Sequence, residues 1–147
     1  MKYLGLDLGT KSLGISISDK TGLIASFYQN IKYNDEKELF SSLKEILEKE
    51  NIDKIVLGYP KNMDNSEGFR AEETLEFKEK LEDIFSGEVI LEDERLTTKV
   101  ATDVLINADM SRKKRKKVID GVSAVVILQS YLDRRNNNEW RRKKDNR

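Results

Sequence analysis

The first third of the chain alternates short apolar runs with turn residues. Residues 2–8 are mostly apolar, residues 13–18 alternate apolar with polar positions, and residues 23–31 follow a second turn. A period of two within short runs, bounded by Gly, Asp and Thr, is typical of β-strands. The pattern therefore predicts three strands joined by short turns, which is an antiparallel meander.

Beyond residue 34 the apolar period lengthens to that of an amphipathic helix, and helices then alternate with short apolar strands. The remaining predicted elements are a helix at about 35–50, a strand at 54–58, a helix from Leu75 to about Ser86, a strand at 89–91, a helix at 96–105 and an apolar helix from Val118 to about Leu132. The order βββαβαβαα predicts an α/β domain with a mixed five-stranded sheet and helices packed on its faces. Functional groups of such sheets lie at the C-terminal ends of the strands.

Composition narrows the chemistry that this chain can perform. Its 147 residues are enough for one domain, and they include neither cysteine nor histidine. Disulfides, thiolate metal sites and histidine-dependent catalysis are therefore excluded. The chain opens without a secretory signal, and no apolar run approaches membrane-spanning length, so we expect a cytoplasmic protein without membrane contact.

The charges are unevenly distributed along the chain. Residues 111–147 hold 13 of the 27 Lys and Arg residues but only 4 of the 27 Asp and Glu residues. Such an asymmetry is typical of a basic end that binds an anionic partner, and a solvated tail that offsets an acidic body explains it equally well. We expect residues 1–135 to form the folded domain and residues 136–147 to be a basic, disordered tail.

Three carboxylates occupy positions that favour a metal site. Asp7 lies in an apolar strand, where an unpaired charge is costly; Glu94 follows the fifth strand; Asp120 lies near the start of an apolar helix. If these carboxylates converge, they form the oxygen-ligand site that Mg²⁺ or Mn²⁺ prefers. Two such metals can activate a water and stabilise the leaving oxygen of a phosphodiester.

Each carboxylate also has a structural explanation. Backbone amides of the turn at residues 9–11 could satisfy Asp7, and the dipole of its helix favours Asp120 in the first turn. Asp93, the neighbour of Glu94, could pair with Arg95. Strand alternation places Asp93 and Glu94 on opposite faces, so only one of the two can point toward a shared site.

The turn Asp7-Leu8-Gly9-Thr10-Lys11 resembles the phosphate-binding hairpin of sugar kinases and actin-like ATPases. Those proteins enclose the nucleotide between two such domains, and 147 residues hold only one. The spacing also differs from that of a Walker P-loop. Nucleotide hydrolysis is therefore a competing hypothesis that the length of the chain disfavours.

Four motifs together resemble the YqgF/RuvX family, described as Holliday junction resolvases and as nucleases of pre-16S ribosomal RNA. They are Gly5-Leu6-Asp7-Leu8-Gly9-Thr10-Lys11 with Gly14 and Ser18-Asp19; Gly58-Tyr59-Pro60 with Asn62; Asp93-Glu94-Arg95-Leu96-Thr97-Thr98; and Asp120 with Ala124 and Ile127-Leu128-Gln129-Ser130-Tyr131-Leu132. The resemblance runs from about Tyr3 to Leu132. It implies a ribonuclease H-like fold, with Asp7, Glu94 and Asp120 as metal-binding catalytic residues. The chain departs from the family in the 61–70 loop, where Asn65-Ser66 and Gly68-Phe69 replace the more usual Gly-Thr and Gly-Pro.

A run of six basic residues ends three positions before Asp120, where phosphates would be attracted toward the carboxylates. A solvated linker is the alternative. The candidate nucleic-acid contacts are Lys11, Arg70, Arg95, Arg112, Lys113, Lys114, Arg115, Lys116 and Lys117. The only tryptophan, Trp140, lies in the basic tail, where it is either exposed or able to stack on a base.

The resemblance implies a nuclease that matures the 5′ end of 16S ribosomal RNA. The alternatives are a Holliday junction resolvase, which requires a dimer acting on branched DNA, and a non-catalytic nucleic-acid or ribosome-binding factor. The sequence leaves open RNA against DNA, and monomer against homodimer.

Overall fold

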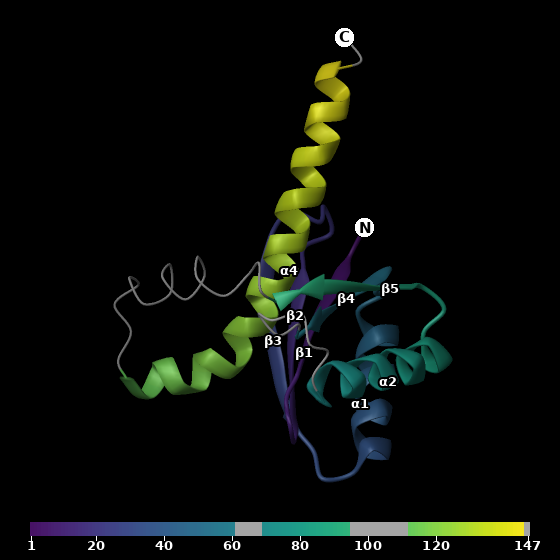
Figure 1. Ribbon diagram of the computed structural model, residues 1–147, viewed down its shortest axis with the longest axis vertical. Coiled ribbons are helices and arrows are strands. Elements are labelled where there is room, and N and C mark those ends of the chain that lie inside the picture. Colours follow the sequence, from purple (N-terminus) through teal and green to yellow (C-terminus); the bar gives the residue numbers. More distant parts are fainter. Residues whose placement is uncertain (61–68, 95–111, 146–147) are drawn as a thin grey trace.

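The computed structural model describes residues 1–60, 69–94 and 112–145, with the backbone alone for residues 69–70, 112–121 and 139–145. A five-stranded sheet lies between helices on both faces (Figure 1). Its elements are β1 (Tyr3–Leu8), β2 (Ser12–Ser18), β3 (Ala25–Lys32), α1 (Glu36–Lys49), β4 (Lys54–Tyr59), α2 (Phe69–Ile84), β5 (Glu88–Asp93) and α4 (Arg112–Asp145). The predicted mixed sheet is confirmed. The predicted helix at 96–105 and most of the 61–70 loop lie outside the described residues.

The strands are ordered β3-β2-β1-β4-β5, so β1 is at the centre of the sheet. β1 is antiparallel to β2 and parallel to β4, and β4 is parallel to β5. The C-terminal ends of β1, β4 and β5 therefore meet at one edge of the sheet. The segments that follow β1, β4 and β5 in the chain therefore start at that edge of the sheet.

Helices α1 and α2 cover one face of the sheet. The alternate residues Leu4 and Leu6 of β1 pack there with Leu43 of α1 and Leu81 of α2, and all four are fully buried. α1 begins where the side chain of Asp35 accepts a hydrogen bond of 3.0 Å from the Lys37 backbone N–H, which is a typical N-cap. The larger of two hydrophobic clusters therefore lies on this side.

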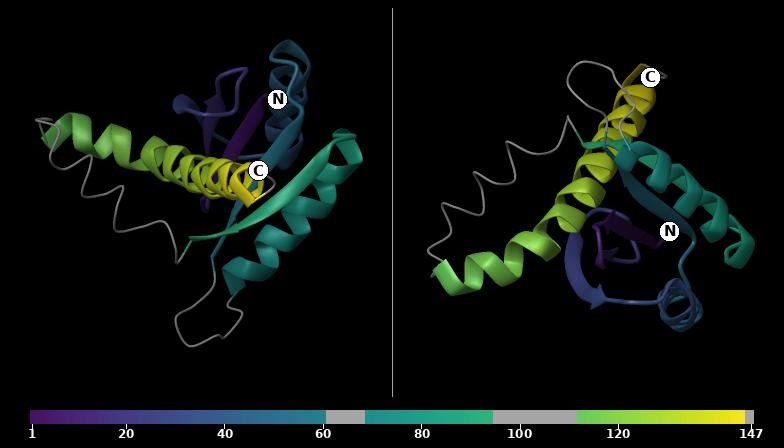
Figure 2. Two further views of the ribbon diagram at one scale, coloured as in Figure 1. Left: turned by 90° about the horizontal axis from the view of Figure 1, so that it is seen from above. Right: turned by 60° about the horizontal axis from the view of Figure 1, so that its bottom comes forward.

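Helix α4 covers the opposite face, as the views in Figure 2 show. Its residues Ile127, Leu128 and Leu132 pack against Tyr3 and Val56 from the sheet. The helix approaches β1 so closely that a Cβ at Gly5 would lie only 2.7 Å from the Leu128 Cβ. Glycine at this position is what allows α4 to lie against the sheet.

Helix α4 is longer than the sequence pattern predicted. It begins at Arg112 instead of Val118, so the basic run forms its first turns, and it continues through Asp145 instead of ending near Leu132. The helix can continue because neither Gly nor Pro follows Gly121, and because Arg, Lys and Glu are good helix formers. The division into a folded domain of residues 1–135 and a disordered tail of residues 136–147 stays a prediction. Within the described residues, no helix is long and apolar enough to cross a membrane.

Candidate active site

Asp7 lies on the face of the sheet that α4 covers. In β1 the side chains of Leu4 and Leu6 point toward α1 and α2, so strand alternation places Tyr3, Gly5 and Asp7 on the other side. Asp7 is half-buried near the C-terminal end of the strand. This is the edge at which the three parallel strands end.

Glycines flank Asp7 on both neighbouring strands. Gly14 of β2 is its direct register partner, and the pairing of Leu6 with Leu57 places Gly58 beside Asp7 on β4. Neither neighbour carries a side chain. The Asp7 carboxylate is therefore flanked by glycine backbone on both sides, and neither neighbouring strand places a side chain of its own beside it.

Glu94 comes to the same place from β5. Its side chain lies over Gly58, because a Cβ at that glycine would be 2.7 Å from Glu94 Oε1 and 2.5 Å from Ile127 Cδ1 of α4. Asp93, the last residue of β5, is the register partner of Tyr59, and alternation directs it to the other face. Of this acidic pair, Glu94 is the residue that shares a face with Asp7.

Asp120 lies on α4, in the part for which the backbone alone is described. It precedes Ile127 by seven residues, which is about two turns or roughly 10 Å along the helix. Among the described side chains, no group of three or more His, Cys, Asp or Glu is arranged to hold a metal ion. Two of the three predicted ligands, Asp7 and Glu94, are described, and they occupy the same face at the same edge.

Glu92 is a buried acid that the sequence analysis did not identify. Its side chain is 1% exposed, and both of its carboxylate oxygens accept hydrogen bonds from Arg134 of α4. Burial raises the pKa of the Glu92 carboxyl, and the Arg134 guanidinium partly opposes that rise. In the sequence, the only signal for the burial of Glu92 is that an acidic residue stands at an inward-facing position of β5. The ion pair ties the end of β5, and with it Glu94, to α4.

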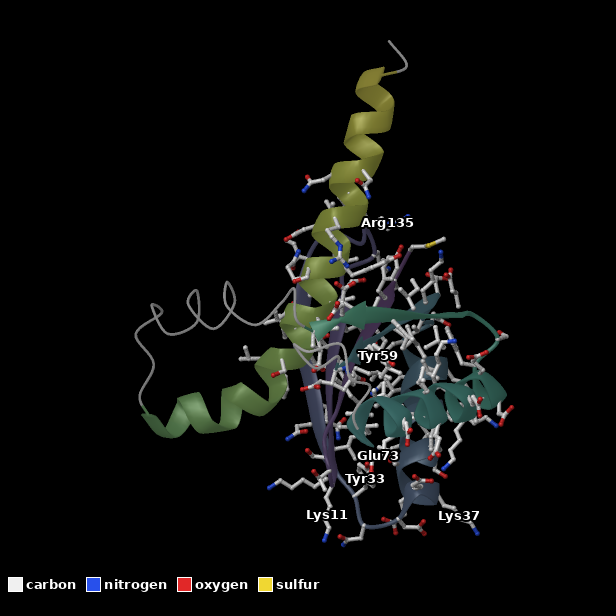
Figure 3. All side chains as sticks on the ribbon, viewed as in Figure 1. Lys11, Tyr33, Lys37, Tyr59, Glu73 and Arg135 are labelled. Carbon is white, nitrogen blue, oxygen red and sulfur yellow. The ribbon has the colours of Figure 1, made fainter. Side chains whose placement is uncertain are left out.

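The predicted nucleic-acid contacts are distributed over several elements. Lys11 is exposed in the β1–β2 turn, and Figure 3 shows it at the end of the sheet near Tyr33. Arg70 lies in the first turn of α2, Arg112 to Lys117 form the start of α4, and Arg95 lies outside the described residues. The structure therefore places six of these residues on the helix that also carries Asp120.

The β1–β2 turn also borders a pocket of about 220 Å³ on the side of α1 and α2. Its charged lining consists of Glu36, Glu73, Glu76 and Lys80, and Lys80 is already paired with Glu36 at 2.6 Å. Such a lining repels phosphate groups. The pocket therefore does not favour the nucleotide-binding hypothesis that the hairpin sequence raised.

Comparisons with known proteins agree with this fold. A family model described as "RuvX: Holliday junction resolvase" matches residues 1–134. Two relatives named "Putative pre-16S rRNA nuclease", from Bacillus cytotoxicus and Bacillus subtilis (strain 168), are each 50% identical over 135 residues, which cover 90% of this chain and 98% of the relative.

Two solved structures share the arrangement of the chain. The RuvC of T. thermophilus in complex with a Holliday junction substrate matches with a TM-score of 0.58 and 13% identity over 92% of this chain and 96% of that one. The Holliday junction resolvase of fowlpox virus matches with a TM-score of 0.53 and 19% identity over 90% and 99%. These likenesses confirm the ribonuclease H-like fold.

Proposed function

This chain belongs to the RuvX family, and on that premise we propose that it is a metal-dependent nuclease that processes the 5′ end of precursor 16S ribosomal RNA. The observation that supports the proposal most is the placement of two carboxylates beside the same glycine. Asp7 from β1 and Glu94 from the end of β5 share a face on either side of Gly58. The relatives that are half identical to the chain carry the name of this activity.

The residues present fit a divalent metal. The donor set is made of carboxylate oxygens, in a chain without histidine or cysteine, and this is the chemistry that Mg²⁺ and Mn²⁺ prefer. Asp7 and Glu94, together with Asp120 from α4, would hold the metal. When bound, the metal activates a water and stabilises the leaving oxygen of the phosphodiester.

The rest of the site would bind and orient the RNA. The six basic residues at the start of α4 would attract the RNA backbone toward Asp120. Lys11 would add a contact at the end of the sheet. Phosphate contacts of this kind set the register of the RNA on the protein. An enzyme with this substrate works in the cytoplasm, where ribosomal RNA is matured.

The test is cleavage of a 16S precursor that carries its 5′ extension, with Mn²⁺ or Mg²⁺. We expect the wild type to shorten the 5′ end, and Asp7→Asn and Glu94→Gln to lose at least about a hundredfold in kcat, which is typical for loss of a preorganised charge-stabilising group. Asp93→Asn is the matched control, because it removes the neighbouring carboxylate from the opposite face. Cleavage that persists in Asp7→Asn, or an equal loss in Asp93→Asn, would refute the assigned site.

Branched DNA is the second candidate substrate, because the matching family model is described as a Holliday junction resolvase. The same preparations should be assayed on a four-way junction, with the oligomeric state measured by light scattering. Paired cuts by a dimer, faster than cleavage of the RNA precursor, would favour the resolvase. Tight RNA binding by the wild type without any cleavage would instead favour a non-catalytic binding factor.

A further inference from the structure

The C-terminal end of α4 lies beyond the residues that the family model matches. The family model ends at residue 134, and a relative that matches over 100% of its own length covers only 92% of this chain. The helix nevertheless continues to Asp145 and runs past the edge of the sheet (Figures 1 and 2). We call residues 137–145 the arm.

Three consecutive residues fix the direction in which the arm leaves the domain. Arg134 pairs with the buried Glu92 of β5, Arg135 lies 5.4 Å from the centre of the Tyr3 ring of β1, and Asn136 Nδ2 donates to the Gly22 carbonyl in the β2–β3 turn at 3.2 Å. Figure 3 shows Arg135 at the point where the helix passes the sheet. The helix is thus held from three separate segments just before it leaves the body, which sets the direction in which the arm extends.

The composition of the arm excludes an apolar partner. Residues 137–145 contain four basic and two acidic residues, and Trp140 is the only apolar residue among them. Asn137 and Asn138, which follow the anchor residues, are exposed. A helix with one apolar residue cannot bury a stripe against another protein, whereas clustered Arg and Lys are complementary to a polyanion.

The position of the arm relates it to the site. Ile127, whose Cδ1 would lie 2.5 Å from a Cβ at Gly58, precedes Arg141 by 14 residues, or about 21 Å along α4. The basic run that ends at Lys117 lies ten residues to the other side, or about 15 Å. The carboxylates therefore lie between two basic segments of one helix, and α4 bends between them (Figure 1).

We infer that the arm binds the phosphate backbone of a double-helical part of the RNA substrate, about 20 Å from the carboxylates. This inference rests on the proposed function for the identity of the RNA. The arm contacts phosphates and not bases, so it adds affinity and register without sequence preference. The arm and the basic run at the start of α4 would then hold the RNA on two sides of Asp7 and Glu94.

The test compares neutralisation of charges on the arm with neutralisation elsewhere. The arm variant carries Arg141→Gln, Arg142→Gln and Lys144→Gln, and the control carries Lys37→Gln, Lys44→Gln and Lys49→Gln on α1, which covers the opposite face. Binding to an RNA hairpin longer than two helical turns is measured in EDTA, so that no RNA is cut, over a series of salt concentrations. A chain shortened to residues 1–136 keeps all three anchors and removes the arm.

We expect the arm variant to bind about tenfold more weakly at low salt, with a slope of log K against log salt about 3 smaller than in the wild type. The shortened chain, which also loses Lys143 and Arg147, should lose about 4–5 in that slope. The α1 control should keep the wild-type slope. In cleavage assays the arm variants should raise KM without lowering kcat, whereas Asp7→Asn should lower kcat. A failure of the nuclease proposal can therefore be distinguished from a failure of the proposal for the arm. Equal binding by the arm variant and the α1 control would overturn the inference. A loss seen with duplex DNA but not with RNA would overturn the assignment to RNA.

Discussion

Replacing Gly58 with alanine should damage catalysis far more than stability. The added Cβ would lie 2.7 Å from Glu94 Oε1 and 2.5 Å from Ile127 Cδ1. Ordinary carbon contacts are about 3.5–4.0 Å, so both atoms must move by about 1 Å. Both are the far ends of side chains that can rotate, so the backbone of β4 and α4 has no need to shift.

The free energy of unfolding should therefore change little. Overpacking costs about 1–3 kcal/mol, with flexible neighbours at the low end, and exchanging Gly for Ala in a strand returns about 0.5–1 kcal/mol. The net destabilisation should be at most about 1 kcal/mol. Catalytic groups, however, must be placed to within about 0.5 Å, and a shift of about 1 Å costs about a hundredfold in rate. Glu94 is the group that shifts.

Two measurements on each of three variants separate these effects. Urea unfolding and metal-dependent RNA cleavage are compared for Gly58→Ala, Ile127→Val and the double variant. Ile127→Val removes the methyl group that the new Cβ would meet, so the double variant should be less destabilised than the sum of the single changes. Its cleavage should stay low, because the Glu94 carboxylate is still displaced. Cleavage at the wild-type rate by Gly58→Ala would show that Glu94 does not act from its position over this glycine.

Three further substitutions test the parts of the structure that hold the site. Gly5→Ala should lower the free energy of unfolding by about 2–4 kcal/mol, because the new Cβ would lie 2.7 Å from the Leu128 Cβ, which cannot rotate away; a smaller urea effect than that of Gly58→Ala would contradict the packing argument. Arg134→Gln should cost about 1–3 kcal/mol, since it leaves the buried Glu92 without its partner while Arg134 itself is 48% exposed; adding Glu92→Gln should restore part of that loss, and an additive double variant would disprove the coupling. Hydrogen bonds from Thr21 and from two backbone amides lower the pKa of Asp19 from 3.8 to about 2, so its contribution to stability is present above pH 3.8 and is lost as the pH falls through about 2; acid unfolding of Asp19→Asn should show a weaker pH dependence in that window than the wild type.

The order and type of the elements could be predicted because they depend on neighbours in the chain. A period of two in residues 13–18 and a helical period in residues 35–50 reflect which face of each element is buried, and the structure has both elements where they were predicted. The position of Asp7 could be predicted for the same reason. The sequence alone shows a charge at the end of an apolar strand. It also shows that the residues around this charge resemble a known motif.

Contacts between distant segments decided the rest. That Glu94 shares a face with Asp7, and that Glu92 is buried against Arg134, depends on the pairing of β5 with β4 and on the packing of α4 across the sheet. The length of α4 beyond Leu132 was not visible in the sequence, because its polar composition shows no burial, whereas contacts of Arg135 and Asn136 with distant segments hold the helix against the sheet. Sequence by itself determined which elements form and where the charges fall along them. Only the tertiary structure decided which charges meet, because residues separated by tens of positions come together through packing that no local pattern records.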